Sequence, residues 1–165
     1  MLVKLHLDID LRVQAIRREN PDWLCGKGCD GCCRHLADVP RLTLAEWNLL
    51  REGLSVLSQQ QLQEIRVSMT ALIGRRSGPV ICPLLDTATG SCSVYARRPI
   101  ACRTYGFYVQ RDQGLYCRDI ESRVVDGVLE DVVWGNHDVV DRRLADFGGS
   151  RELTDWFESW LSASE

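Results

Sequence analysis

The stretch "CGKGCDGCC", residues 25 to 33, holds four of the eight cysteines of this 165-residue chain. Its three glycines allow sharp backbone turns, so several side chains can face one point. A thiolate serves both as a metal ligand and as a nucleophile. The stretch is therefore compatible with a disulfide knot, a catalytic thiol, a redox cluster or a metal site.

The N-terminal sequence "MLVKLHLDIDLRVQAIRREN" argues against export, because charged residues interrupt every short apolar run. We therefore expect a cytoplasmic protein that neither enters nor crosses a membrane. Thiols stay reduced in the cytoplasm, where clustered cysteines are more often metal-binding or catalytic than disulfide-bonded. The formal net charge of -3 disfavours nucleic acid as a partner. Metal ions are the expected partners, and a protein partner is left open.

Hydrophobic periodicity predicts helices at both ends of the chain. Near the N-terminus, Ile9, Val13 and Ile16 share one helical face, and Pro21 follows as a stop signal. Near the C-terminus, "NHDVVDRRLADFGG" and "LTDWFESWLS" have amphipathic patterns. Their apolar residues are candidates for the core: Val140, Leu144, Phe147, Leu153, Trp156, Phe157 and Trp160.

Two further helices begin at capping boxes. Thr43 has a glutamate three residues later, and Ser58 has a glutamine at the same spacing. The second pattern continues until Gly74. Because a short turn joins the two helices, we expect an antiparallel αα-hairpin. Such a hairpin would return the chain to its starting point and bring Cys82 close to Cys33.

These elements predict a mainly α fold with a minor β-hairpin at about residues 112–114. The chain has no linker long enough to separate two folding units, so residues 1–165 are expected to form a single domain. Its cysteine-rich, irregular metal-binding region would span about residues 25–117. A helical C-terminal part would span about residues 118–165.

Eight thiols match the ligand count of two tetrahedral four-sulfur metal sites. Neighbouring side chains tend to diverge, so Cys32 and Cys33 are expected to point into different centres. Cys25 and Cys117 are the least constrained candidates, because Cys117 would also fit a core position. His35 follows the cluster closely, but a lone histidine is more often not a ligand. The candidate metal ligands are Cys25, Cys29, Cys32, Cys33, Cys82, Cys92, Cys102 and Cys117.

The spacing from Cys25 through Cys29 to Cys32 also matches the three-cysteine motif of radical S-adenosylmethionine enzymes. Those enzymes usually place an aromatic residue before the third cysteine, where this chain has Gly31. Their partial barrel also needs more β/α units than the sequence offers. The sequence therefore argues against this class of enzyme.

A longer pattern combines "CGKGCDGCC" with "CPLLDTATGSCSVYARRPIACRTYGF" about fifty residues later. Its most specific features are Cys82-Pro83, Gly90-x-Cys92, Tyr95, Arg98-Pro99 and Cys102-Arg103. Over residues 25 to 110 the chain resembles the CxxCxxCC family, the YkgJ-like cysteine-cluster proteins. The resemblance implies a zinc- or iron-chelating domain. One departure is that three residues separate Cys25 from Cys29, where the family name implies two.

The cysteine pattern is also similar to that of flagellin lysine methylases, which would imply an iron-sulfur cluster and methyl transfer. The short chain offers no obvious substrate domain for such a reaction.

Three arginines near the second set of cysteines could offset thiolate charge or form a solvated helix face: Arg97, Arg98 and Arg103. Tyr95 could donate its hydroxyl to a sulfur or a carboxylate, or simply pack. Sulfur ligands suit zinc and iron-sulfur clusters alike. We favour zinc, because the sequence shows no redox or substrate partner for a cluster.

The leading hypothesis is a protein that binds zinc or iron through an eight-cysteine constellation for structure, storage or delivery. An iron-sulfur redox or methyl-transfer enzyme is the first alternative. A protein-interaction module with structural zinc is the second. We identify no catalytic constellation beyond the cysteines, so enzymatic activity is left open.

Overall fold

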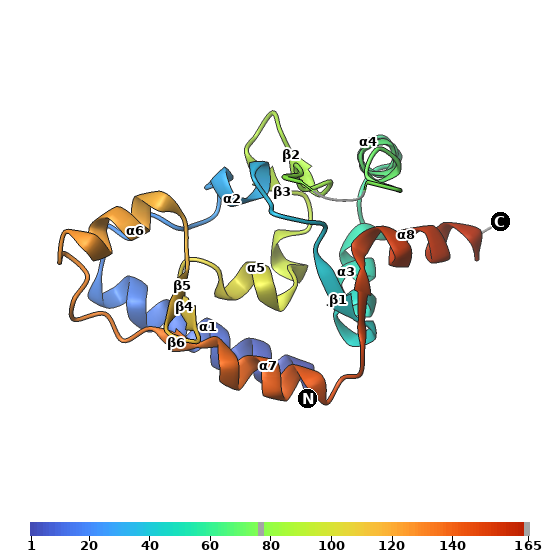
Figure 1. Ribbon diagram of the computed structural model, residues 1–165. Coiled ribbons are helices and arrows are strands. Elements are labelled where there is room, and N and C mark those ends of the chain that lie inside the picture. Colours follow the sequence, from blue (N-terminus) through green and yellow to red (C-terminus); the bar gives the residue numbers. More distant parts are fainter. Residues whose placement is uncertain (76–77, 164–165) are drawn as a thin grey trace. The chain divides into compact units, whose positions relative to one another are not determined.

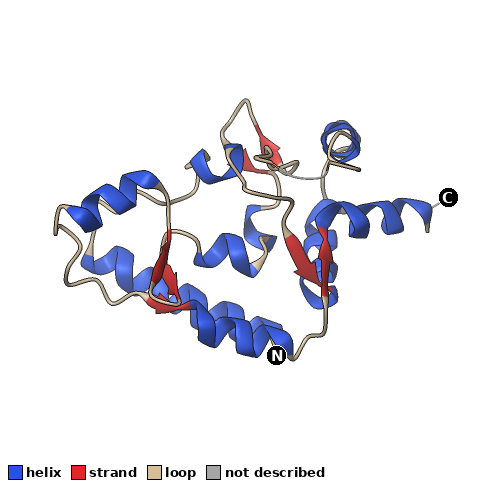
Figure 2. Ribbon diagram, viewed as in Figure 1, coloured by secondary structure: helices blue, strands red, loops and turns tan. Residues whose placement is uncertain are grey.

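A computed structural model describes residues 1–75 and 78–163 (Figure 1). The fold is mainly helical with short strands, as expected (Figure 2). None of the described helices combines the length and apolar character that a membrane crossing requires. Packing contacts divide the chain into two compact units. The first unit comprises Met1–Gly26 and Ile100–Phe147, and the second comprises Lys27–Pro99 and Gly148–Glu165.

The first unit is built around a long N-terminal helix and a small sheet. Its helices are α1 (Leu2–Glu19), α5 (Ile100–Thr104), α6 (Arg118–Val125) and α7 (His137–Ala145). Its strands are β4 (Tyr108–Gln110), β5 (Gln113–Leu115) and β6 (Gly135–Asn136). Its core contains Leu5, Ile9, Ile16, Ile100, Phe107, Tyr108 and Val140.

Helix α1 confirms the N-terminal prediction. Ile9 and Ile16 are each 1% exposed, and Val13 packs partly buried against the same core. The helix ends at Glu19, and the backbone N–H of Asn20 donates to the carbonyl of Ile16. The chain therefore leaves the helix just before Pro21, as a stop signal requires.

The predicted β-hairpin is present, but its turn comes earlier than expected. In the β4–β5 pair, Gln110 lies opposite Gln113, so Arg111 and Asp112 form the turn. Both residues have positive φ angles, 48° and 61°, as a type I′ hairpin turn requires. Gly114 therefore belongs to a strand, not to the turn. Strand β6 adds to β4 in parallel.

The second unit contains most of the cysteines and its own core. Its helices are α2 (Gly31–Arg34), α3 (Leu44–Leu54), α4 (Gln59–Thr70), the 3₁₀ turn η1 (Tyr95–Arg97) and α8 (Leu153–Ser162). Its strands are β1 (Arg41–Thr43), β2 (Leu85–Asp86), β3 (Ser91–Cys92) and β7 (Ser150–Glu152). Leu42, Leu50, Leu54 and Leu153 are completely buried in its core.

Both predicted capping boxes are confirmed. The Thr43 side chain accepts a hydrogen bond from the Glu46 backbone, and the Glu46 carboxylate accepts one from the Thr43 backbone. Ser58 and Gln61 form the same reciprocal pair at the start of α4. Helix α4 nevertheless ends at Thr70, four residues before Gly74. The last apolar residues of the predicted pattern, Leu72 and Ile73, lie in a turn.

The antiparallel αα-hairpin is not confirmed. Helix α4 points towards the viewer in Figure 1, whereas α3 runs up the page, so the two helices cross. The apolar side chains of α4, Ile65 and Met69, are buried in the core that also contains Phe157 of α8. Helix α4 packs against α8.

The last part of the chain is divided between the two units. Helices α6 and α7 belong to the first unit, whereas β7 and α8 pack in the second. Trp156 of α8 donates from Nε1 to the carbonyl oxygen of Leu42, 2.9 Å away, and its ring stacks on Trp47. The organisation of residues 1–165 as a single domain stays a prediction.

Candidate metal centre

The cysteines are distributed unequally between the units. Five belong to the second unit: Cys29, Cys32, Cys33, Cys82 and Cys92. Three belong to the first: Cys25, Cys102 and Cys117. The predicted loop "CGKGCDGCC" is therefore split between the two units at Gly26 and Lys27.

Backbone hydrogen bonds bring Cys33 and Cys82 together across the 48 residues between them. Leu36 and Val80 form an antiparallel bridge with N···O distances of 2.8 and 3.0 Å. The N–H of Cys82 then donates to the carbonyl oxygen of Cys33 at 2.7 Å. The proximity that we expected is present, but extended backbone pairing produces it instead of a helical hairpin.

Cys92 joins this neighbourhood through the β2–β3 hairpin. Leu85 lies opposite Cys92, and the N–H of Ser93 donates to the carbonyl oxygen of Leu84 at 2.9 Å. Cys33, Cys82 and Cys92 all pack within or against the core of the second unit. Three separate segments thus contribute thiols to one region, which we call the thiol cluster: Cys32, Cys33, Cys82 and Cys92.

Cys32 and Cys33 do not diverge as the sequence suggested. Both lie in the single turn of α2, and their sulfur atoms are 4.0 Å apart. Two sulfurs on one tetrahedral zinc ion are separated by about 3.8 Å, given Zn–S bonds of about 2.3 Å. The observed separation therefore favours a shared centre for this pair over two different ones.

The thiols of the cluster influence one another electrostatically. The hydrogen bond with Cys32 lowers the pKa of Cys33. The hydrogen bond with Cys82, burial and the charges of Cys82 and Cys92 raise this pKa and outweigh the first effect, so the net pKa is about 12. The hydrogen bond with Cys33, together with burial, raises the pKa of Cys32. Without a cation, several thiolates cannot coexist here, and a bound metal ion would relieve their repulsion.

Arg98 is a cation that acts on the cluster. Burial raises the pKa of Cys92, whereas the backbone N–H of Val94 and the charge of Arg98 lower it. The Arg98 guanidinium lies 3.6 Å from the centre of the Tyr95 ring, and the Lys27 ammonium lies 5.8 Å from the same centre. Tyr95 thus stacks beneath the arginine and orients it.

The other two arginines form ion pairs with carboxylates. Arg97 contacts Glu52 at 3.4 Å, and both side chains are well exposed. Arg103 contacts Asp10 at 3.1 Å within the first unit, where its own side chain is only 10% exposed. Of the three predicted arginines, Arg98 carries a charge that lowers the pKa of a thiol in the cluster, that of Cys92.

Asp30 and Arg34 also shape the centre, and the sequence reading missed them. Their side chains form a 2.6 Å ion pair, and Arg34 also donates to the carbonyl oxygen of Thr87 at 3.3 Å. A Cβ atom on Gly90 would lie 3.2 Å from the Asp30 carboxylate, and Gly90 has a φ of +67°. These contacts hold α2 against the β2–β3 turn. The i,i+4 spacing of Asp30 and Arg34 was the available sequence signal.

The remaining cysteines have different surroundings. Cys29 is exposed in the loop before α2. In the first unit, Cys25 Sγ lies 3.7 Å from the carbonyl oxygen of Tyr105, and a Cβ on Gly106 would come within 2.7 Å of that sulfur. Cys102 lies in α5, and Cys117 forms the N-cap of α6.

The histidines are distributed over both units. His35 is exposed, and its Nδ1 contacts the carbonyl oxygen of Gly31 at 3.0 Å within its own turn. His6 is buried in α1, and His137 is buried in α7, both in the first unit.

Across residues 1–75 and 78–163, no three histidine, cysteine, aspartate or glutamate side chains already have the spacing of a complete metal site. The donor chemistry of the thiol cluster nevertheless fits a soft cation, because four reduced sulfurs share one partly buried region. The cysteine side chains would have to rotate to direct all four sulfurs at one ion.

Comparison with known proteins supports metal binding. The model of the CxxCxxCC family, described as "Putative zinc- or iron-chelating domain", matches residues 24–122. No curated protein and no solved structure gives a significant match to the chain. The matched segment includes every cysteine and more than half of the sequence. The chain therefore belongs to the CxxCxxCC family of zinc- or iron-chelating domains.

Proposed function

We propose that this protein binds zinc through the thiol cluster, with Cys32, Cys33, Cys82 and Cys92 as the four ligands of one centre. The observation that carries the proposal is that these thiols come together from three segments. Cys32 and Cys33 lie in α2, Cys82 lies just before β2, and Cys92 lies in β3. Metal binding would tie together segments that are distant in the sequence. Such a centre contributes directly to the folding free energy.

Three features support zinc at this centre. Four thiolates form a closed tetrahedral set, which is typical of structural zinc sites. Arg98 offsets part of the excess negative charge that four thiolates would leave around a divalent ion. The described residues of the second unit also show no redox or substrate partner that an iron-sulfur cluster would serve. Iron, held directly or as an iron-sulfur cluster, uses the same soft ligands and is the competing outcome.

We further propose that the remaining cysteines, Cys25, Cys29, Cys102 and Cys117, also bind metal, which completes an eight-cysteine constellation. The role of the bound metal would be structural, or storage or delivery of the ion. We place the protein in the cytoplasm, where its thiols would stay reduced.

The test is the composition of the protein purified without air. Zinc, iron and acid-labile sulfide are measured by elemental and colorimetric analysis, and the visible absorption spectrum is recorded. We expect a colourless protein with about two zinc ions per chain, which is the capacity of eight thiolates in four-sulfur sites. The variant Cys82→Ser should lose about one of these ions, because it removes a ligand of the thiol cluster alone.

Two outcomes would overturn the proposal. A brown protein that contains iron and sulfide would replace zinc by an iron-sulfur cluster. A metal-free protein that takes up no zinc after full reduction would reject the metal centre itself.

A further inference from the structure

The first unit contains a second candidate site, which is a groove lined by α1, α7 and the end of β6. Its volume is about 250 Å³. That volume exceeds the roughly 150 Å³ of a protein cavity that accommodates benzene. None of its lining residues is a cysteine or belongs to the second unit. The groove is therefore separate from the thiol cluster and needs its own explanation.

The walls of the groove are apolar. Leu5 and Ile9 line it from α1, and Val139 and Val140 line it from α7. Trp134 lies beside them, in contact with the rings of Trp23 and Tyr116. These side chains would take the hydrocarbon part of a ligand out of water.

The Tyr108 ring packs closely against strand β6 at the groove. Tyr108 pairs with Gly135 across β4 and β6, and a Cβ on Gly135 would lie 2.3 Å from the ring. Glycine is therefore needed for this close approach. Tyr108 is only 4% exposed, and burial raises its pKa to about 12, so its hydroxyl remains protonated.

Tyr108 lines the groove, and its hydroxyl is not one of the fully buried side-chain atoms that lack a partner among residues 1–75 and 78–163, so we take it to be accessible from the groove. A ligand that accepts a hydrogen bond would satisfy this donor.

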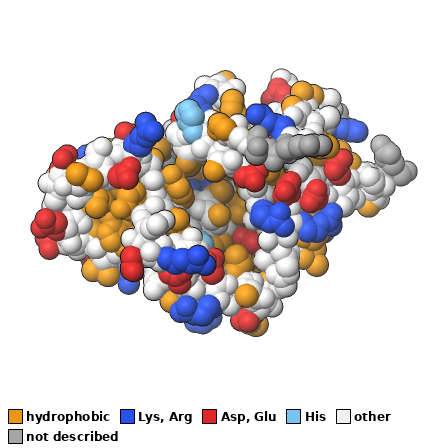
Figure 3. All heavy atoms as spheres, in the orientation of Figure 1, with side chains coloured by type: hydrophobic (Ala, Val, Ile, Leu, Met, Phe, Trp, Pro, Cys, Tyr) orange, Lys and Arg blue, Asp and Glu red, His pale blue; other side chains and the backbone are white. Residues whose placement is uncertain are grey.

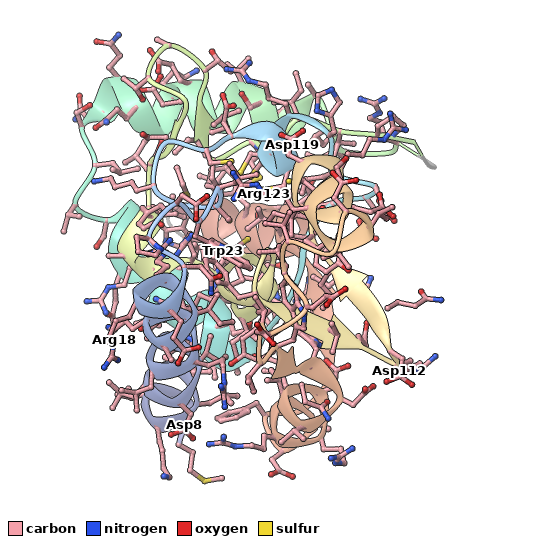
Figure 4. The ribbon with its side chains drawn as sticks, turned by 90° about the vertical axis from the view of Figure 1, so that its left-hand side faces the viewer. Asp8, Arg18, Trp23, Asp112, Asp119 and Arg123 are labelled. Atoms are coloured by element: carbon pink, nitrogen blue, oxygen red, sulfur yellow. The ribbon has the colours of Figure 1, made fainter. Side chains whose placement is uncertain are left out.

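Two guanidinium groups give the groove a positive balance. Arg143 is paired with Asp8 through a 2.7 Å contact between α7 and α1; Asp8 is labelled in Figure 4. Arg12 makes one weak contact, 3.4 Å to the carbonyl oxygen of Val133. The charges of both arginines act on the Tyr108 hydroxyl, as do those of Asp8 and Asp10. Asp10 is paired with Arg103, and Arg12 forms no ion pair with a carboxylate within residues 1–75 and 78–163.

We propose that this groove binds a small organic carboxylic acid, whose carboxylate pairs with Arg12 and accepts a hydrogen bond from Tyr108. The apolar part of the acid lies against Leu5, Ile9 and Val140. An anion suits the site because a planar carboxylate matches the guanidinium fork. A neutral apolar ligand would leave the tyrosine and arginine donors unsatisfied.

The test uses benzoate and isobutyrate as probes, with benzamide as the uncharged control for benzoate. Backbone amide shifts of the full chain, purified with its own metal, are followed by NMR. We expect benzoate or isobutyrate to shift amides of residues 5–12, 108 and 134–143. Benzamide should bind at least about tenfold more weakly than benzoate, because it lacks the charge-assisted bond.

Matched variants separate the site from general charge effects. Arg12→Gln should weaken binding about tenfold, and Tyr108→Phe should weaken it by a similar factor. Arg142→Gln removes the same charge from an exposed position on α7 that does not line the groove, and it should leave affinity unchanged. Near-UV circular dichroism checks that each variant is folded.

The proposal is overturned if neither acid shifts these amides at about 10 mM, which corresponds to very weak affinity. Equal affinities for benzoate and benzamide would reject recognition of the carboxylate. An unchanged affinity in folded Arg12→Gln would reject the assigned residue. None of these results depends on which metal the thiol cluster holds.

Discussion

The two units use cysteine in different ways. In the second unit, backbone pairing gathers thiols from separate segments against one core, and they alter one another's pKa values. In the first unit, Cys25 packs against the backbone near Gly106, while Cys102 and Cys117 lie in or next to short helices. The difference teaches that cysteine number is a poor guide to a metal centre. What matters is whether the backbone brings the thiols into mutual contact.

The units also differ in what their cores need. The first unit closes its core around α1 with aliphatic and aromatic side chains. The second unit places Cys33, Cys82 and Cys92 within or beside its core, so part of its interior is sulfur. On our proposal, removal of metal therefore destabilises the core of the second unit more than that of the first.

Figure 3 shows acidic and basic side chains interspersed on one face of the molecule, so no single charge dominates that face.

Removal of the metal should have the largest effect. Treatment with a chelator under reducing conditions is expected to lower the free energy of unfolding of the second unit by about 5 kcal/mol or more, because binding energy is folding energy at such a centre. Hydrogen exchange should accelerate in residues 27–36 and 78–94. Exchange in α1 should change little. Equal acceleration in both units would contradict the comparison.

The variant Cys82→Ser should produce the next largest effect. The thiol is 9% exposed and interacts with Cys33, so its loss leaves an incomplete ligand set. We expect a loss of about 3 kcal/mol in stability, measured by urea unfolding of the metal-loaded protein. Exchange at α2 and at β2–β3 should increase together.

Cys117→Ser is the matched control for that experiment. It makes the same chemical change in the first unit, where Cys117 forms the N-cap of α6. Exchange at α2 should stay as in the unmodified protein. If this variant loosened α2 as much as Cys82→Ser does, the thiols could not be divided as we propose.

Gly135→Ala should destabilise the first unit specifically. An alanine Cβ would lie 2.3 Å from the Tyr108 ring, so the ring or strand β6 must shift. Overpacking of this kind costs about 2 kcal/mol. Thermal unfolding measures the loss, and the metal content should remain unchanged. Gly149→Ala is the control, because an added Cβ there would meet nothing within 4 Å. A wild-type melting temperature for Gly135→Ala would show that the contact tolerates a methyl group.

A pH effect of smaller size is expected from His6. Burial lowers its pKa from 6.5 to about 4; the charge of Arg103 also lowers it, and that of Asp10 raises it. Between these values the unfolded chain binds a proton that the folded unit excludes, so stability is full above pH 6.5 and declines as the pH falls towards 4. The decline should be about 2 kcal/mol, because solvent screening reduces the full shift.

His6→Leu should flatten that decline, since leucine does not titrate. Urea unfolding at pH 7 and pH 4.5 gives the comparison. Persistence of the full pH dependence in this variant would assign it to another group.

Much of the local structure was predictable. The apolar spacing of α1 and the capping boxes of α3 and α4 depend on neighbouring residues, which the sequence shows directly. The small hairpin was also predicted, although its turn lies at Arg111 and Asp112. Non-glycine residues in left-handed conformations are uncommon. We therefore expected the turn to include Gly114, and its predicted position is a residue or two too late.

The candidate site was predictable in part. The sequence identified the cysteines and their family, and it suggested that Cys82 would approach Cys33. It did not indicate the bridge between Leu36 and Val80, which creates that approach. It also missed Asp30 and Arg34, because an ion pair at i,i+4 on a surface looks the same whether or not it supports a site.

The sequence by itself determined which residues can bind metal and where most helices begin, because thiol chemistry and helix capping are properties of a few adjacent residues. Only the tertiary structure decided which thiols meet, how α4 crosses α3, and that Tyr108 faces a groove with Arg12. Those outcomes depend on contacts between residues dozens of positions apart. Such contacts form only where burial of apolar surface outweighs the entropy of ordering the chain between them.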